Sequence, residues 1–243
     1  MTDAKGMPEA IADLCAAFVH GLQEALGDKL AGVYLYGAAA FPDSVPSRDV
    51  DFHAILKEKL TTEERAALND LHAALTRDFP PLGAELDGYY ILWQDAGGAR
   101  PPADQLRPGV ADESWALHCA HIRAGRCIPL YGPDPLGLYP APAWPELEAA
   151  LHGELRYVAE HPEYPDYGIL NLCRLMYSFE TRDVVISKAM AAEWARRAML
   201  QWRLLIELAK KSYAGQATVE DKEQMTAGLG RLYEFACRRI RGK

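Results

Sequence analysis

The chain has 243 residues, of which 49% are hydrophobic and 25% are charged, and its formal net charge is −8. This composition excludes a largely disordered chain, and no run approaches the ~20 apolar residues of a membrane-spanning helix. The acidic balance argues against a broad, sequence-independent hold on nucleic acid and favours a small or cationic substrate. The length predicts two domains.

The cysteines and the N-terminal residues indicate the compartment. The five cysteines are scattered and are never spaced Cys-x-x-Cys, which favours reduced thiols over a disulfide framework or a zinc site. The first residues include an acid and lack a basic segment followed by an apolar block, so we expect no signal peptide. Both observations predict a cytoplasmic protein.

The N-terminal half begins with a helix and two strands. Apolar residues recur with the helical period over residues 8–25, and Gly27 follows as a stop signal. The apolar run at residues 30–36 ends at Gly37 and predicts the first strand. A second strand is predicted to begin at Val50, where apolar residues alternate with polar ones.

The next elements complete a small sheet. Thr61 and Glu64 match a capping box, which begins a helix that ends near Asp78. Residues 84–93 alternate and are rich in Tyr and Ile, which predicts a third strand. A long loop rich in Gly, Pro and Ala, a short helix and a short strand are then expected over residues 95–110, 114–124 and 128–131. The order of these elements predicts an α/β layer.

A proline-rich segment separates this half from a helical one. Residues 132–145 contain five prolines and two glycines, which is typical of a linker. Helical periodicity then covers residues 146–160, 167–181, 187–213 (with a break near Arg197) and 219–241, which predicts a bundle of four or five helices. We therefore expect domains at residues 1–133 and 146–243, joined by a linker over 134–145.

Four acidic residues predict the chemistry of the N-terminal half. Asp49 and Asp51 are two residues apart at the start of the second strand, so their side chains project to the same side. Two carboxylates at one point suit Mg²⁺ held together with substrate phosphates. Glu85 and Asp87 share a face by the same alternation, and either of them can supply a third acid. The pattern predicts a metal and nucleoside triphosphate site beside the turn at Gly37.

The strand, glycine turn and Asp-x-Asp pattern resemble the nucleotidyltransferase fold of the polymerase-β type. Five segments are also similar to bacterial aminoglycoside adenylyltransferases that modify streptomycin and spectinomycin: Val33-Tyr-Leu-Tyr-Gly37, Ser47-Arg-Asp-Val-Asp51, Leu130-Tyr-Gly-Pro133, Leu170-Asn-Leu-Cys-Arg-Leu-Met-Tyr177 and Ser187-Lys-Ala-Met-Ala-Ala-Glu-Trp194. The similarity covers nearly the whole chain. It implies an α+β fold, with an N-terminal polymerase-β-like nucleotidyltransferase domain on a small mixed sheet and an α-helical C-terminal domain.

The resemblance implies an activity and its main residues. In this family ATP lies between the two domains, and AMP passes to a hydroxyl of the aminoglycoside with release of pyrophosphate. Asp49 and Asp51 would then hold two Mg²⁺ ions, and Asp87 would be the general base. Lys188 would reach the triphosphate from the C-terminal domain. The implied partners are ATP and a small cationic substrate.

The other implied contacts lie at the turn and in the short helix. Gly37 and Ala38 would bind the nucleotide through backbone N–H groups, although the family has serine where this chain has Ala38. Trp115 occupies the position of a family tryptophan near the aminoglycoside. Residue 87 is aspartate where the family has glutamate, so its side chain is shorter by one methylene.

Two other functions stay open at this point. One is a nucleotide-binding regulator with a decayed catalytic turn, which Ala38 suggests, and the other is a nucleotidyltransferase that acts on a protein or on tRNA. Two cleft-forming domains are compatible with a monomer, and neither a membrane nor nucleic acid is expected as a partner.

Two polar features in predicted helices are given structural interpretations. His118 and His121 are one helical turn apart, but no third ligand follows at a suitable spacing, so we expect surface histidines rather than a metal site. Arg174 lies in an apolar helical stretch, where a buried arginine needs an acidic partner. We expect that partner to be Glu180 or Asp183.

Overall fold

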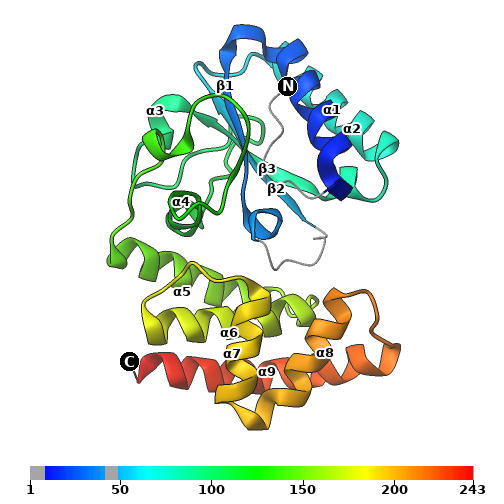
Figure 1. The fold of residues 1–243 in the computed structure, drawn as a ribbon, viewed down its shortest axis with the longest axis vertical. Coiled ribbons are helices and arrows are strands. Elements are labelled where there is room, and N and C mark those ends of the chain that lie inside the picture. The colour runs from blue at the N-terminus through cyan, green and yellow to red at the C-terminus, as the bar shows by residue number, and fades with distance from the viewer. Residues whose placement is uncertain (1–8, 42–48, 243) are drawn as a thin grey trace. The chain divides into compact units, whose positions relative to one another are not determined.

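The computed structural model describes residues 9–41 and 49–242 (Figure 1). The chain divides into two compact units, Met1–Pro142 and Ala143–Lys243, and this division falls within the residues predicted as a linker. The N-terminal residues used to predict the compartment, and Ser47 of the motif that precedes Asp49, lie outside the described residues. None of the described helices is long and apolar enough to cross a membrane.

The first unit is built on a mixed four-stranded sheet. Its main elements are α1 (Glu9–Leu26), β1 (Leu30–Leu35), β2 (Val50–Leu56), α2 (Thr62–Asp78), β3 (Leu86–Leu92), α3 (Trp93–Ala96), α4 (Trp115–Arg123) and β4 (Ile128–Tyr131). The strand order is β3-β2-β1-β4. β2 and β3 are parallel, whereas β1 is antiparallel to both β2 and β4. The small mixed sheet predicted from the sequence is confirmed.

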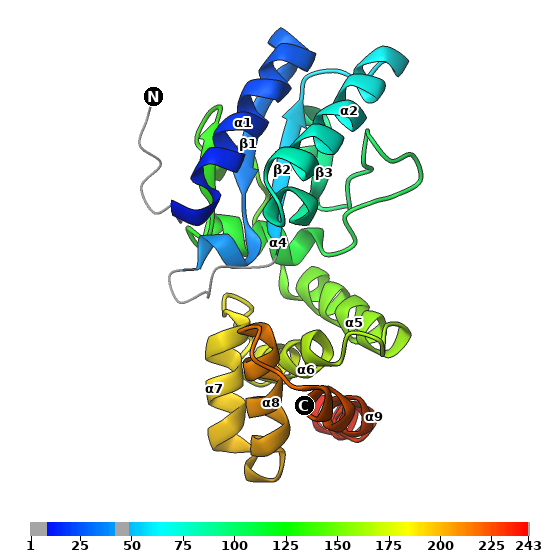
Figure 2. The same ribbon diagram turned by 90° about the vertical axis from the view of Figure 1, so that its right-hand side faces the viewer.

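The two faces of the sheet are covered by different helices (Figures 1 and 2). Val33 and Leu35 of β1 belong to a core shared with Phe18 of α1 and Leu68 of α2. The residues between them point the other way, so Tyr34 packs in a second core with residues of α4. This second face matters for function, because Asp51 and Asp87 lie on it by the same alternation.

Helices α1 and α2 form for reasons that are visible in the sequence. The buried residues of α1 recur with the helical period: Ile11, Leu14, Cys15, Phe18, Leu22 and Leu26. In α2 the Thr61 hydroxyl accepts a hydrogen bond from the backbone N–H of Glu64 at 3.2 Å. The Glu64 carboxylate accepts from the backbone N–H of Thr61 at 2.7 Å, which completes the capping box. Both helices also end close to the residues at which the sequence predicts their ends.

The second unit is helical throughout its regular structure. It contains α5 (Trp144–Glu160), α6 (Pro165–Thr181), α7 (Lys188–Ala198), α8 (Arg203–Tyr213) and α9 (Val219–Arg241). Helix α6 is central, because it packs against each of the other four helices. The long helix predicted over residues 187–213 is broken at Met199, where the backbone leaves the helical region. Among the described residues this gives five helices, at the upper end of the prediction.

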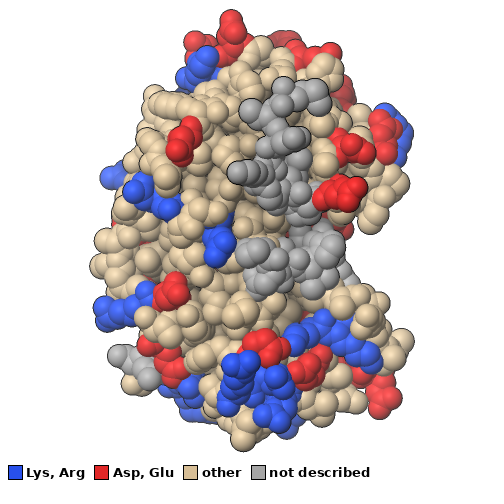
Figure 3. Space-filling view, in the orientation of Figure 1, with Lys and Arg blue, Asp and Glu red and all other residues tan. Residues whose placement is uncertain are grey.

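Charged side chains of the helical unit lie among side chains of opposite charge on the face drawn in Figure 3. Glu193 pairs with Arg196 within α7 at 3.0 Å and with Lys210 of α8, and Arg196 also lies 3.3 Å from Glu207 of α8. Such partly exposed pairs contribute little to stability individually. They orient the surfaces of the two helices.

The expected partner of Arg174 is corrected by the structure. Its guanidinium lies 3.6 Å from Glu154 of α5, whereas Glu180 pairs with Arg239 at 2.7 Å. Six residues separate Arg174 from Glu180, and at about 3.6 residues per turn that spacing places them on different sides of α6. A partner on a neighbouring helix was closer than any acid on the same one.

Candidate active site

The turn after β1 brings the backbone against Asp51. Gly37 has a φ of +64°, a conformation that glycine adopts without a steric cost. A Cβ added at Gly37 would lie 1.8 Å from Oδ2 of Asp51. The backbone N–H of Tyr36 also donates to the carbonyl oxygen of Asp51 at 3.0 Å. Only glycine at this position leaves room for the Asp51 carboxylate.

Asp51 and Asp87 are direct neighbours across the parallel pair of strands. The register of β2 and β3 pairs Asp51 with Asp87, so the two side chains leave the same face of adjacent strands, roughly 5 Å apart at their backbones. Asp51 is half-buried, whereas the side chain of Asp87 is 73% exposed. Asp49 immediately precedes β2 and is half-buried. The structure therefore sets Asp51 beside Asp87, as the alternation within the two strands predicts.

Glu85 lies just outside the strand that carries Asp87. It ends a short 3-10 helix, Leu82–Glu85, and β3 begins one residue later at Leu86. The alternation of side chains applies only within a strand, so it does not place Glu85 on the face of Asp87. Asp87 is the acid that belongs to the strand.

The residue after Gly37 is Ala38, which begins the first turn of a 3-10 helix, Gly37–Ala40. The carbonyl oxygen of Ala38 accepts a hydrogen bond from the backbone N–H of Phe41 at 3.1 Å. Its methyl side chain cannot donate a hydrogen bond as a serine hydroxyl would. The turn can therefore offer backbone donors only.

Arg107 lies beside Asp87, and sequence reasoning missed it. Its guanidinium is within 3.4 Å of Asp87, 2.5 Å of Asp104 and 2.6 Å of the carbonyl oxygen of Gly88. Asp104 is buried and also accepts from the backbone N–H of Tyr90 at 3.1 Å. Burial lowers the pKa of Arg107, but Asp104 and Asp87 outweigh that and raise it. The sequence predicted only a long loop over residues 95–110, and the structure shows that this loop places the Arg107 guanidinium beside Asp87.

Lys188 is held by aromatic side chains within the helical unit. It is the first residue of α7, which Ser187 caps by accepting from the backbone N–H of Met190 at 3.1 Å. The Lys188 ammonium donates to the hydroxyl of Tyr213 at 2.9 Å and lies 4.3 Å from the centre of the Tyr167 ring. These contacts orient the ammonium over two ring systems.

Trp115 lies inside the first unit rather than at its surface. Its side chain is 1% exposed in the core beside α4, and its indole N–H donates to the carbonyl oxygen of Gly98 at 2.8 Å. The ring contacts those of His53 and Tyr139. In this arrangement Trp115 packs the core and does not present its ring to a substrate.

Comparison with known proteins identifies the helical unit. Residues 145–238 match the family model described as the aminoglycoside adenylyltransferase C-terminal domain. The helical unit is therefore similar to the C-terminal domain of the family that the sequence resembles. The matched residues include Lys188 and all but the first residue of α5.

Solved structures extend the comparison to the whole chain. The spectinomycin adenyltransferase AAD(9) from Enterococcus faecialis, solved with ATP and spectinomycin, is similar over 94% of this chain and 98% of its own, with a TM-score of 0.77 and 19% sequence identity. No curated protein matches the sequence. The whole chain therefore has the nucleotidyltransferase fold of an adenyltransferase, as predicted.

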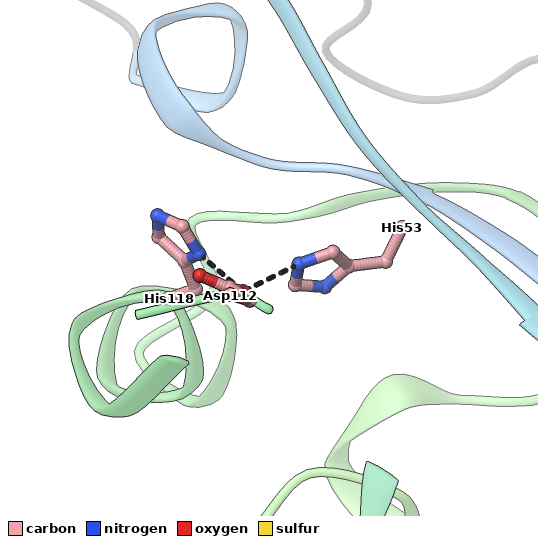
Figure 4. A group of neighbouring side chains, drawn as sticks. All are labelled: His53, Asp112 and His118. Atoms are coloured by element: carbon pink, nitrogen blue, oxygen red, sulfur yellow. Dashed lines mark hydrogen bonds and ion pairs between the residues drawn. The ribbon is translucent and has the colours of Figure 1, made fainter. Parts of the chain in front are cut away.

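Beside the acids of this family fold lies a polar cluster that sequence reasoning missed (Figure 4). His53 of β2, Asp112 of the loop before α4 and His118 of α4 meet in one group. The expectation of surface histidines in α4 is therefore wrong, because His121 is buried and His118 hydrogen bonds to Asp112. The one available signal was His53 itself, a polar residue on a strand whose other inner positions are apolar.

Proposed function

We propose that this protein transfers AMP from ATP to a hydroxyl of a small cationic substrate of the aminoglycoside class, such as spectinomycin or streptomycin, and releases pyrophosphate. The family of the C-terminal domain and a fold shared with an adenyltransferase solved with ATP and spectinomycin support the proposal. The observation that carries it is the register that sets Asp51 against Asp87 beside the turn at Gly37.

Asp49 and Asp51 are the proposed ligands of two Mg²⁺ ions. The donor set fits, because Mg²⁺ favours one or two carboxylates and completes its shell with phosphates and water. Because Gly37 has no Cβ, Oδ2 of Asp51 can occupy the space beside the turn. When held by Asp49 and Asp51, Mg²⁺ would supply positive charge that offsets the negative charge developing on the triphosphate.

Asp87 is the proposed general base. It takes the proton of the acceptor hydroxyl, whose oxygen then forms a bond to the α-phosphorus of ATP. The bond from that phosphorus to the oxygen bridging to the β-phosphate breaks, and pyrophosphate leaves with the electron pair. The exposure of Asp87 suits an acceptor that arrives from solvent.

The remaining residues bind and orient. Backbone N–H groups of the turn at Gly37 and Ala38 would bind phosphate oxygens, as turns of this kind often do. Lys188, held by Tyr167 and Tyr213, would supply a positive charge to the triphosphate from the helical unit. Trp115 is left out of the direct contacts because it is buried.

The proposed setting follows from the substrates. An acidic chain attracts a polycationic acceptor, and the reaction needs ATP, so we place it in the cytoplasm and expect a monomer to carry it out. Modification of an aminoglycoside there would give the cell resistance to that antibiotic.

The test compares two aspartate variants of the purified chain. We expect Asp51→Asn to lose pyrophosphate release with Mg-ATP and spectinomycin or streptomycin, while Asp70→Asn on the exposed side of α2 keeps it. The same pair of variants, expressed in a susceptible bacterium, should lose and keep resistance respectively. Full turnover by Asp51→Asn would overturn the proposed mechanism.

Ala38 favours a second candidate function, a nucleotide-binding regulator. Tight binding of Mg-ATP without pyrophosphate release across a panel of aminoglycosides would support it. Release that requires a protein or tRNA acceptor would instead keep the chemistry and change the substrate. Restoring the hydroxyl with Ala38→Ser should raise a weak transfer activity and leave a pure binding protein inactive.

A further inference from the structure

Three side chains from separate segments converge below the turn after β1 (Figure 4). Oδ2 of Asp112 lies 3.2 Å from Nε2 of His53 and 2.8 Å from Nδ1 of His118. The three ligand-type atoms all lie within 4.8 Å of one another. In tetrahedral coordination with bonds of about 2.0–2.1 Å, neighbouring ligand atoms are roughly 3.3 Å apart, so only small movements would open a place for an ion.

The cluster contains a buried carboxylate, that of Asp112, whose described partners use only part of its capacity to accept hydrogen bonds. The side chains of His53 and Asp112 are 0% exposed and that of His118 is 21% exposed. Among the described residues, Oδ1 of Asp112 is buried and has no hydrogen-bond partner. A buried anion is costly unless it is paired and hydrogen bonded. This carboxylate therefore has an acceptor oxygen to spare for a cation.

The surroundings resemble the outer shell of a metal site. Nδ1 of His53 lies 3.1 Å from the hydroxyl of Tyr139, which can accept a hydrogen bond from Nδ1–H and so leave the lone pair on Nε2 facing Asp112. The ring of Tyr36 packs against both imidazoles, with centroids 4.2 Å and 4.4 Å apart. These contacts fix the orientation of the rings.

We propose that His53, Asp112 and His118 bind one Zn²⁺-class transition metal ion, with two nitrogen ligands and one carboxylate, and that water or the second oxygen of Asp112 fills the fourth position. Imidazole suits zinc, whereas Mg²⁺ prefers oxygen ligands, so this site is distinct from the one proposed at Asp49 and Asp51. It goes beyond the proposed function. The ion would clamp β2, the loop before α4 and α4 itself beneath the catalytic turn.

The test measures binding rather than activity. The full chain is stripped with a chelator, dialysed, and titrated with Zn²⁺ or with the spectroscopic substitute Co²⁺ in excess Mg²⁺, which occupies the acidic site. We expect one equivalent to bind per chain, the intense visible absorption of four-coordinate Co²⁺ with imidazole ligands, and a rise in melting temperature of roughly 5 °C or more at saturating Zn²⁺.

Three variants decide where the ion binds. His118→Asn, at the most exposed ligand, should fold in the absence of metal and lose the cobalt band and the thermal shift. His161→Asn, at the C-terminal end of α5 in the helical unit, should keep both, and so should Asp51→Asn.

Two results would overturn the proposal. One is the absence of stoichiometric binding at micromolar Zn²⁺, which would leave the cluster as a network held by protons. The other is binding that survives in His118→Asn or disappears in Asp51→Asn, which would assign the ion elsewhere. Failure of AMP transfer alone leaves this measurement unaffected.

Discussion

Strand β2 carries two polar sites that differ mainly in their exposure. Asp51 and His53 are two residues apart and leave the same face of the strand. Asp51 sits next to an exposed acid, Asp87, and a glycine turn. His53 is fully buried with Asp112 under aromatic rings. The exposed site is open to the substrates proposed for it, whereas the buried one is large enough only for the ion proposed there or for direct hydrogen bonds among its side chains.

The two sites are coupled through Tyr36, the residue before the glycine turn. Its ring packs on His53 and His118, and its backbone N–H donates to the carbonyl oxygen of Asp51. Burial raises the pKa of Tyr36 well above its ordinary value, and the charges of Asp112 and Asp51 raise it further. The comparison teaches that the buried site can support the geometry of the open one without contacting a substrate.

Among the variants that compare the two sites of β2, Gly37→Ala is expected to have the largest effect. The new Cβ would lie 1.8 Å from Oδ2 of Asp51, and the alanine backbone would have to adopt a φ of +64°. The carboxylate must therefore move by about 1 Å or more. We expect AMP transfer to fall at least about 10²-fold, with an additional loss of stability of about 1 kcal/mol. Initial rates of pyrophosphate release and thermal unfolding measure the two effects.

Gly125→Ala is the matched control for this variant. Gly125 has a φ of +78°, and a Cβ there would meet nothing within 4 Å. It should share the loss of stability and keep the rate. Equal rates for the two variants would mean that contact between the turn and Asp51 is unimportant for the reaction.

Asp112→Ala should destabilise the first unit, although no substrate contact is proposed for Asp112. It removes the carboxylate that contacts both imidazoles, and breaking a buried pair of this kind costs about 3 kcal/mol, or roughly 6–12 °C in melting temperature for a chain of this size. Asp70→Ala on exposed α2 is the control. A shift no larger than that of the control would contradict the role given to the cluster.

The difference in stability between wild type and Asp112→Ala should depend on pH in a definite direction. The folded-state pKa of Asp112 lies below its ordinary value of 3.8. A depressed carboxyl pKa contributes stability above the unfolded value and loses it as the pH falls through the folded one. The stability gap between wild type and Asp112→Ala should therefore be full above about pH 4 and shrink below it, as chemical unfolding at a series of pH values would measure.

Arg107→Ala should give the smallest effect, confined to the open site. Without the guanidinium, Asp87 loses a partner at 3.4 Å and the loop loses its tie to Gly88. Because Arg107 is a positioning residue, its loss should lower kcat by about 10-fold and leave KM for ATP within about 2-fold of the wild-type value. Arg100→Ala, in the same loop but exposed, should change neither constant. A rise in KM alone would assign Arg107 to nucleotide binding.

Periodic patterns predicted much of the fold. The buried face of α1 and the capping box of α2 depend on residues a few positions apart, which a sequence displays directly. The pairing of Asp51 with Asp87 was accessible because both lie within regular strands. The start of β3 was less accessible, because the chain before it forms a 3-10 helix that includes Glu85 and in which Gly83 packs tightly against the backbone of Leu75.

Contacts between distant segments were not accessible in this way. Fifty-nine residues separate His53 from Asp112, so no local spacing could reveal the cluster. Arg107 acts through Asp104, whose burial depends on how the loop folds back on β3. The partner of Arg174 likewise lies on a neighbouring helix. Local rules predict elements and faces, whereas such sites require the packed structure.

The most direct test of the central claim is the rate of pyrophosphate release by Asp87→Asn, measured together with the affinity of the variant for Mg-ATP. The account predicts that kcat falls by about 10²–10⁴-fold and that ATP affinity is unchanged, while Asp87→Glu keeps a proton acceptor and Glu85→Gln keeps the wild-type rate. A wild-type rate in Asp87→Asn, or a loss confined to Glu85→Gln, would contradict the assignment of Asp87 as the base of this site.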